Sequence, residues 1–174
     1  MNDCQTSSMD PSGDVGNRSS IRHQAAAGLR AGDTLTVTRS FSKRDVVDFA
    51  GITRDYNPVH FDEPFSLAKG FKNPICHGLL VGSLLTEIGG QIGWLASRMD
   101  FRFRKPVFFN DTISCKLTLT KVDEGGKAEA EALFTNQDGV VVVQAFLGGI
   151  IPGEQGRDIL KQMLAEGDPT NAAG

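Results

Sequence analysis

Asp55 and His60 stand five residues apart in the segment DYNPVH, on either side of an Asn-Pro turn. A histidine titrates near neutral pH, and a carboxylate can orient it or share its proton transfers. Such a pair suits general acid–base catalysis on a bound water molecule. The alternative is structural: Asp55 closes an Asx-turn, and His60 is a buried, hydrogen-bonded polar residue. On spacing alone, the structural interpretation is the commoner one.

A second candidate group lies in the segment ICHGLL, residues 75–80, at the expected start of a long helix. The first N–H groups of a helix have no partner inside it and lie at the positive end of its dipole. Because glycine lets a carbonyl oxygen approach the backbone closely, the N–H of Gly78 is a candidate oxyanion donor. Ordinary packing of the helix on a sheet explains the same glycine equally well.

Metal and redox chemistry have little support in the sequence. His60, Asp62 and His77 come nearest to a ligand cluster, but their spacing fits no zinc pattern. The three cysteines are odd in number and far apart, with no CxxC pair, which is typical of free thiols in a reducing compartment. We therefore expect no metal ion, no cofactor and no disulfide.

The loop that carries Asp55 lies between two expected helices. A capping pattern at Ser42 and Asp45 precedes apolar residues and predicts a first helix over about 43–53. Pro58 disfavours helical geometry at the residue before it, so the loop must be a turn or an extended segment. A short second helix is expected over about 64–69.

From Gly78 to about Ser97, apolar residues recur at three- and four-residue spacing and predict a core helix. Its five glycines each cost on the order of 1 kcal/mol relative to alanine, which suggests that other backbone packs closely against it. A sheet wrapped around the helix would provide such packing. A membrane span over residues 75–95 is the alternative. His77, Glu87 and Gln91 lie within these residues, however, and a buried helix explains the composition better.

Strand-like patterns occupy five segments, at residues 34–38, 99–105, 111–122, 127–136 and 139–151. Together with the helices they predict one α+β domain over residues 31–152, with the long central helix packed on an antiparallel sheet. The polar residues 1–30 are expected to be disordered. Residues 153–174 are expected to form a tail with a short helix over 157–164.

The bulk properties of the chain exclude several classes of protein. Its 174 residues suffice for one packed core, and its formal net charge of −3 gives no basic field for nucleic acid. The N-terminal thirty residues have no apolar run and carry three aspartates, which argues against a signal peptide. We expect a cytoplasmic protein with no nucleic-acid partner and no membrane partner.

Taken together, these motifs resemble those of the MaoC-like dehydratases and (R)-specific enoyl-CoA hydratases. Residues 55–60 look like that family's D-x-N-P-x-H hallmark, and residues 73–80 (NPICHGLL) look like its P-I-x-H-G-h-L element, where h is apolar. The resemblance continues through FRKPV at 103–107 and NQDG at 136–139, and it covers about residues 33–152. Several motifs in the right order outweigh the structural interpretation of each one alone.

The resemblance implies a hot-dog fold, usually paired into a homodimer through a continuous sheet. It also implies a lyase that adds or removes water across the double bond of a 2-enoyl thioester, without a cofactor. The residues that match the family's catalytic pair, Asp55 and His60, would hold the water. The amide of Gly78 would receive the thioester oxygen.

Three further residues are expected to support the active site: Asn57, His77 and Thr86, the last at a position where the family often has a serine. The substrate would be an acyl-CoA or an acyl-carrier-protein thioester. A thioester hydrolase of the same fold and a non-catalytic acyl-thioester binding module are the alternatives. The stretch between the core helix and Phe101 is a few residues short and lacks the family's Leu-Pro-Gly turn, so the chain-length preference stays open.

Overall fold

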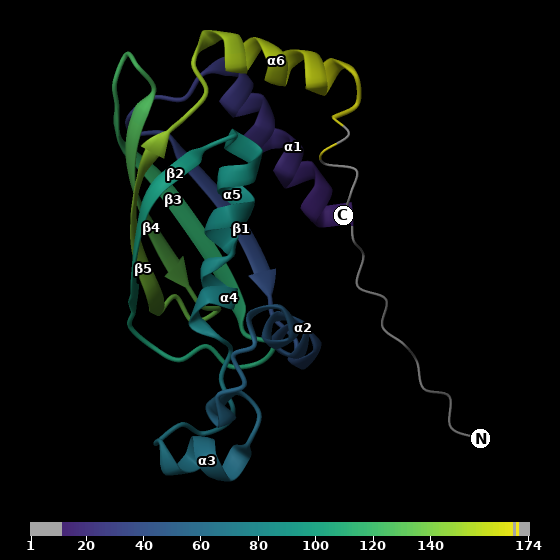
Figure 1. Cartoon of the computed structure of the whole chain (residues 1–174), viewed down its shortest axis with the longest axis vertical. Helices are drawn as coiled ribbons and strands as arrows, with labels where there is room; N and C mark the ends of the chain where they lie inside the picture. The colour runs from purple at the N-terminus through teal and green to yellow at the C-terminus, as the bar shows by residue number, and fades with distance from the viewer. Residues whose placement is uncertain (1–11, 169, 171–174) are drawn as a thin grey trace, which may run out of the picture.

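A single antiparallel sheet of five strands forms the body of the molecule (Figure 1). The computed structural model describes residues 12–168 and 170. The strands are β1 (Thr34–Ser40), β2 (Leu95–Phe103), β3 (Thr112–Val122), β4 (Lys127–Thr135) and β5 (Val141–Ile150). Their order is β1-β3-β4-β5-β2, and all neighbours are antiparallel. The five expected strands are confirmed, with β2 beginning four residues earlier than expected.

Two consecutive helices, α4 (Gly78–Gly82) and α5 (Leu84–Ile92), lie along the inner face of this sheet (Figure 1). Every second residue of β4 is buried and the others are exposed or half-buried, so one face of the sheet meets the helices. Ile88 and Ile92 of α5 are wholly buried and belong to the same apolar core as the inward residues of β3, β4 and β5. A sheet wrapped around a central helical segment is the hot-dog arrangement, and the α+β class is confirmed.

The central helix differs from the expected one because it is broken and ends five residues earlier. It is interrupted at Ser83, whose hydroxyl donates to the carbonyl of Leu80 at 2.6 Å. The hydroxyl of Thr86 donates in the same way to the carbonyl of Ser83 at 2.7 Å. Such side-chain bonds compete with the backbone hydrogen bonds of the helix. Gly93 then ends α5 in the left-handed conformation, with φ of 76°. None of the described helices is long and apolar enough to cross a membrane.

Short helical elements on either side position the loop that follows β1. The helix α2 (Lys43–Thr53) begins at the expected capping box, in which the side chains of Ser42 and Asp45 each accept from the other's backbone N–H. A 3₁₀ turn, η1 (Pro58–His60), and the helix α3 (Glu63–Ala68) follow the loop. Both expected helices are confirmed.

An N-terminal helix corrects the expectation that residues 1–30 are disordered. The helix α1 (Ser12–Ala27) packs against α5 (Figure 1). Among its residues 20–27, whose side chains are described, Ile21, Arg22, Ala25 and Ala26 are buried. This contact was hard to predict, because a docking face of one isoleucine and small alanines lacks the large apolar residues by which amphipathic helices are usually identified. Residues 1–11 lie outside the described residues.

A buried ion pair joins the two ends of the chain. The Nε atom of Arg22 lies 3.6 Å from Oδ2 of Asp168, and both side chains are 7% exposed. The same guanidinium donates to the carbonyl of Gly90 in α5 at 3.3 Å. The helix α6 (Glu154–Ala165) includes the short helix expected in the tail and packs against α1. Residues 153–168 are therefore part of the packed domain rather than a loose tail, whereas 171–174 lie outside the described residues.

Candidate active site

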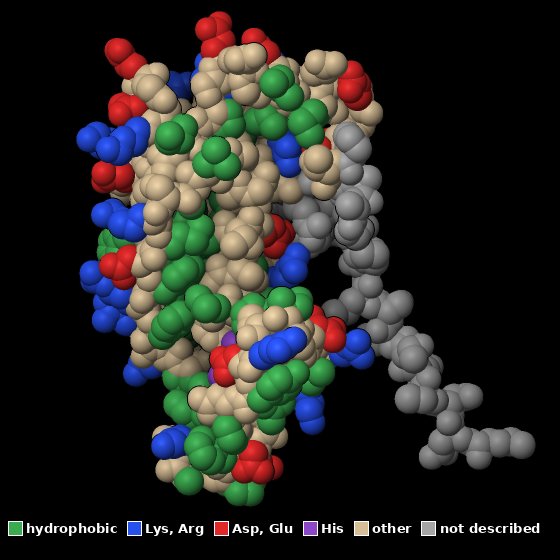
Figure 2. All heavy atoms as spheres, viewed as in Figure 1, with side chains coloured by type: hydrophobic (Ala, Val, Ile, Leu, Met, Phe, Trp, Pro, Cys, Tyr) green, Lys and Arg blue, Asp and Glu red, His purple; other side chains and the backbone are tan. Residues whose placement is uncertain are grey.

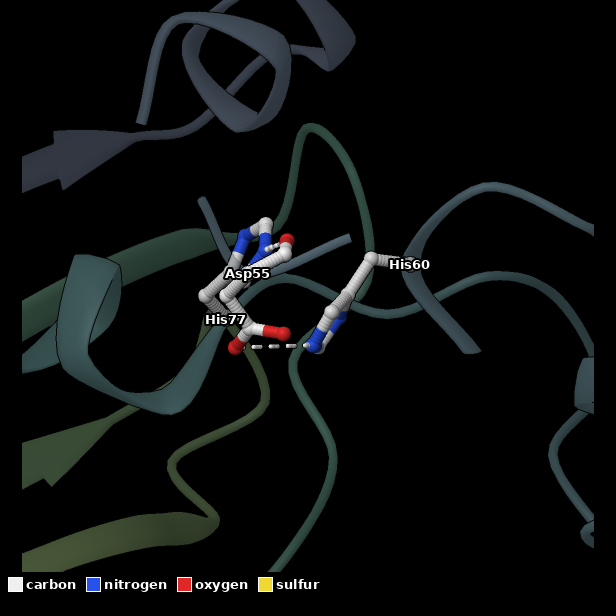
Figure 3. A group of neighbouring side chains, drawn as sticks. All are labelled: Asp55, His60 and His77. Carbon is white, nitrogen blue, oxygen red and sulfur yellow. Dashed lines mark hydrogen bonds and ion pairs between the residues drawn. The ribbon is translucent and has the colours of Figure 1, made fainter. Parts of the chain in front are cut away.

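The loop between α2 and η1 folds around its own polar groups. The backbone N–H of Asn57 donates to Oδ1 of Asp55 at 3.2 Å, and the N–H of Val59 donates to Oδ1 of Asn57 at 3.2 Å. These Asx-type bonds fix the turn before Pro58. They leave the other carboxylate oxygen of Asp55 facing His60 (Figure 3). Asp55 thus closes a turn with one oxygen and offers the second to the neighbouring histidine.

His60 is held by a backbone bond that determines which ring nitrogen is available. Its Nδ1 atom lies 2.8 Å from the carbonyl oxygen of Ile75. A carbonyl oxygen only accepts, so Nδ1 of the neutral ring carries the hydrogen and Nε2 keeps its lone pair. The Nε2 atom lies 4.0 Å from Oδ2 of Asp55 (Figure 3). This gap is too long for a direct hydrogen bond and suits one shared water molecule.

Burial favours the neutral form of His60. The residue is 7% exposed, and the loss of hydration lowers the pKa of its imidazole below the ordinary value of 6.5. The bond to Ile75 and the charge of Asp55 act in the opposite direction, whereas the neighbouring His77 lowers the pKa further. Because the net shift of the pKa is downward, the ring is an unprotonated base at neutral pH.

His77 ties the loop to the start of α4. Its Nε2 atom donates to the backbone carbonyl of Asp55 at 2.9 Å (Figure 3). Its ring lies against that of His60, with centroids 3.8 Å apart and planes inclined by 32°. The side chain of Phe49 packs on the same ring at 5.2 Å. We interpret His77 as a positioning residue, because it anchors the backbone from which the carboxylate of Asp55 extends.

Asp55, His60 and His77 also form a group whose possible metal-ligand atoms lie within 4.8 Å of one another. The Nε2 atom of His77 is already bonded to a carbonyl, however, and Nδ1 of His60 is bonded to another. Oδ2 of Asp55 and Nε2 of His60 remain as possible ligand atoms, and Nδ1 of His77 is buried without a hydrogen-bond partner among the described residues. Asp62, the third residue of the cluster considered from the sequence, instead caps α3 by accepting from Phe65 N–H at 2.7 Å.

A cavity of about 580 Å³ opens beside this pair of residues. Asp55, His60 and Gly78 all line it, so the structure brings these three expected site residues together. Gly78 is the first residue of α4, where a backbone N–H has no partner within the helix. Apolar side chains form most of the remaining wall, among them Ile75, Val81, Phe103, Val107 and Val143. The cavity therefore joins two proton-transfer groups and a backbone donor to an apolar chamber.

Thr86 lies apart from these residues. It lines two other hollows, one with Arg39, Ser83 and Glu87 and one with Gly89, Gly90 and Met99. Its hydroxyl is used in the back-bond that helps to break that helix. The structure thus does not bring Thr86 to the cavity of Asp55 and His60, although the position was expected to support the site.

Two groups that hold the site were not identified from the sequence. The carbonyl of Ile75 fixes the tautomer of His60, and a backbone acceptor leaves no trace in the residue type. The buried hydroxyl of Ser66 lies 2.9 Å from the carbonyls of both Val59 and Asp62 and so ties η1 to α3. Ser66 is the one buried residue of α3, so no apolar pattern in the sequence indicated that role.

Comparison with known proteins decides the family. Residues 22–139 match the model of the family described as the MaoC like domain. The chain belongs to the MaoC-like domain family. This MaoC-like domain is 30% identical over 104 residues to the (R)-specific enoyl-CoA hydratase of Aeromonas caviae, covering 58% of this chain and 78% of that enzyme. It is 37% identical over 87 residues to the mitochondrial 3-hydroxyacyl-[acyl-carrier-protein] dehydratase of Arabidopsis thaliana, covering 49% and 52% of the two chains.

Solved structures agree with this assignment. An R-hydratase from Pseudomonas aeruginosa superposes on the MaoC-like domain with a TM-score of 0.68 at 28% identity, covering 74% of this chain and 86% of that one. The (R)-hydratase of Aeromonas caviae gives a TM-score of 0.68 at 27% identity, covering 72% and 98%. The fold is therefore that of the hydratases and dehydratases.

Proposed function

We propose that this MaoC-like domain is a lyase that adds water reversibly to the double bond of a 2-enoyl thioester and gives the (R)-3-hydroxyacyl thioester. The supporting observation is the pairing of Asp55 and His60 at the apolar cavity, with the free Nε2 and Oδ2 atoms 4.0 Å apart. The relatives named as (R)-specific hydratases support the reaction and its stereochemistry. Their identity to this chain is modest, so the substrate is argued below from the chain's own residues.

In this mechanism one water molecule lies between the two side chains. Its oxygen attacks carbon 3 of the enoyl chain while its hydrogens face Nε2 of His60 and Oδ2 of Asp55. As the carbon–oxygen bond forms, Nε2 takes one proton and the π electrons move onto the thioester carbonyl as an enolate. The imidazolium then returns the proton to carbon 2. The carboxylate of Asp55 orients the water and stabilises the transient positive charge, and the reaction balances without a cofactor.

The enolate oxygen needs a hydrogen-bond donor, and Gly78 offers one. Its N–H is not used by α4 and belongs to a residue that lines the cavity. A donor placed where negative charge develops contributes about 10²- to 10³-fold to turnover in other enzymes. We assign the oxyanion interaction to this amide.

Two basic residues support an anionic carrier for the acyl group. Arg104 and Lys105 line the same cavity, and the guanidinium of Arg104 is oriented by a 3.0 Å bond to Oε1 of Gln144. Guanidinium and ammonium groups are the usual partners of phosphate. Both coenzyme A and the phosphopantetheine arm of a carrier protein carry phosphate, so this feature fits either carrier.

Thioester hydrolysis is the second candidate reaction, because the same water could attack the carbonyl carbon. A cysteine-dependent form of it is disfavoured by Cys76, the cysteine at the cavity. Burial raises the pKa of its thiol to about 12, with a smaller contribution from Asp111, so the reactive thiolate is scarce at neutral pH. A non-catalytic binding module is the third candidate, and it would bind the acyl thioester in the cavity without converting it.

A homodimer through β2 is part of the proposal. This strand is an edge of the sheet, and its nine residues are almost all exposed on both faces. Hydrophobic side chains form a band between β2 and the central helices on the face seen in Figure 2. Its exposed members include Leu79, Met99 and Phe103. Pairing of two β2 strands would satisfy the free backbone groups and cover this band.

The experiment is a hydration assay with crotonyl-CoA. We expect loss of the enoyl absorbance, a 3-hydroxybutanoyl product of R configuration, and no release of free thiol. Release of free coenzyme A in step with loss of substrate would favour the hydrolase. Stoichiometric binding with no change in the substrate would favour the binding module. Sedimentation at several concentrations measures the dimer in the same preparation.

A further inference from the structure

Three segments that carry basic residues border the mouth of the catalytic cavity. They are residues 53–55, 69–72 and 104–105, and each segment includes at least one residue that lines the cavity. The segments come from the end of α2, from the loop after α3 and from the loop after β2. Their basic residues are Arg54, Lys69, Lys72, Arg104 and Lys105, and all five are exposed.

These basic side chains are not neutralised by carboxylates. None of the five forms an ion pair with a described residue. Lys69 and Lys72 instead lie over aromatic rings, at 5.4 and 4.5 Å from the ring centroids. The nearest acidic residues outside the catalytic pair, Asp62 and Glu63, stand at the start of α3. The mouth of the cavity is therefore basic, although the chain as a whole has a formal net charge of −3.

Large apolar side chains stand exposed beside this mouth without lining the cavity. Ile52, near the end of α2, is 83% exposed, and Tyr56, the residue after Asp55, is 63% exposed. The helix α3 buries only Ser66, while its Leu67 is 54% exposed. Figure 2 shows hydrophobic side chains gathered over α2 and α3, among side chains of Lys and Arg. Exposed apolar groups bordered by charged ones are typical of a surface that binds another protein.

We propose that this surface docks an acidic acyl-carrier protein, so that the thioester enters the cavity on the phosphopantetheine arm of that carrier. The docking surface consists of Ile52, Arg54, Tyr56, Leu67 and Lys69. The inference rests on the proposed function, which leaves the carrier open. Coenzyme A would pair its phosphates with the basic residues, but it is too small and too polar to cover apolar side chains on α2, on the loop and on α3 together. An acidic carrier protein offers both carboxylates and a folded apolar surface.

The test compares three substrates that present the same crotonyl group: on a bacterial acyl-carrier protein, on coenzyme A and on pantetheine, which has neither a phosphate nor a protein. Opposite charges at the edge of an interface speed the association of two proteins, and salt screens them. We therefore expect kcat/KM for the carrier-protein substrate to exceed that for crotonyl-CoA by at least about 10-fold. Added salt should reduce this advantage.

Two variants probe the docking surface apart from the cavity. Ile52→Asp and Lys69→Glu should each lower the ratio of carrier-protein to pantetheine activity by about 10-fold, because each places on the surface a charge that repels an acidic partner. Neither side chain lines the cavity, so turnover of the pantetheine substrate reports whether the catalytic site is intact. The matched controls are Ile159→Asp on α6 and Lys121→Glu on β3, two exposed positions away from α2 and α3 (Figure 1). Both controls should keep the wild-type ratio.

Two outcomes overturn the proposal in favour of another occupant. Equal use of crotonyl-CoA and of the crotonyl carrier protein by the wild-type protein would assign the basic mouth to the phosphates of coenzyme A. An unchanged activity ratio in Ile52→Asp, together with a weaker dimer in sedimentation, would assign the surface to a second copy of this chain. A wild-type ratio in both folded variants, with no change in the dimer, contradicts the proposal as well.

Failure of the proposed function would look different. If none of the three crotonyl substrates is hydrated, the lyase assignment fails, and docking is then measured by calorimetric titration with the butanoyl-loaded carrier protein and with butanoyl-CoA. The inference expects the carrier protein to bind more tightly than butanoyl-CoA, and Ile52→Asp to weaken that binding. Absence of binding by the loaded carrier protein contradicts the inference.

Discussion

The Nδ1 atom of His60 and the carbonyl oxygen of Ile75, 15 residues later in the chain, lie 2.8 Å apart. This bond fixes the proton on the side of the ring that faces away from Asp55. The opposite nitrogen is then a base at the cavity without any change of tautomer. Because burial also lowers the pKa of the ring, the free base persists into mildly acidic solution.

The pH dependence of hydration should follow from this arrangement. We expect the acidic limb of kcat/KM to have its midpoint below pH 6.5, because protonation of His60 removes the base and the pKa of the ring is lowered. A profile from pH 4.5 to 9 measures it. A midpoint above 6.5 would contradict the assignment of His60 as the free base.

Stability should depend on pH through the same group. The unfolded chain binds a proton at His60 near pH 6.5, whereas the folded protein does so only at lower pH. The free energy of unfolding should therefore fall as the pH decreases from 6.5 through the folded-state pKa. His60→Gln, which cannot titrate, should show a weaker fall over this range in denaturant titrations. An identical fall in both proteins would assign the effect to other groups.

Gly78→Val is expected to lose turnover of crotonyl-CoA by about 100-fold or more, because the side chain obstructs the approach of the thioester oxygen to the amide. The loss of turnover could also have a second cause, because a Cβ atom at residue 78 collides with the ring of Phe103. The two causes must be distinguished. The melting temperature of the variant shows how far this collision destabilises the fold. The double variant Gly78→Val/Phe103→Ala removes the collision. Restored turnover in it would exclude the oxyanion role.

Deletion of residues 1–28 should lower the free energy of unfolding. It removes the buried side chains of α1, among them Arg22, which pairs with Asp168. Ile21→Ala alone should cost about 2–5 kcal/mol of unfolding free energy. At roughly 2–4 °C per kcal/mol, the melting temperature should fall measurably. Gln24→Ala, at an exposed position of the same helix, is the matched control. An unchanged melting temperature for the truncated chain would show that α1 contributes nothing to the fold.

The elements that the sequence predicted well are those with local causes. The capping box at Ser42 and the alternation along β4 depend on neighbouring residues only, and both appear where expected. The break of the central helix was missed because it depends on hydroxyl bonds at Ser83 and Thr86, residues that also occur in unbroken helices. The docking of α1 was missed because its ion pair joins Arg22 to Asp168, at the far end of the chain.

The candidate site could be predicted in its residues but not in its geometry. The spacing of Asp55 and His60, together with the family resemblance, predicted the pair, and the structure brings both residues to one cavity. Their orientation depends on the carbonyl of Ile75 and on the bond from His77 to the backbone of Asp55. Backbone acceptors are the same in every residue, so no sequence pattern reports them.

The most direct test of the account is the turnover of crotonyl-CoA by Asp55→Asn, His60→Gln and the double variant, measured beside the wild-type protein. Because both side chains act on one water molecule, each single variant should lose about 100-fold or more in kcat, with the melting temperature close to that of the wild type. The double variant should be little worse than the worse single variant. Wild-type turnover in either well-folded single variant would contradict the central claim, and losses that multiply in the double variant would show that the two residues act in separate steps.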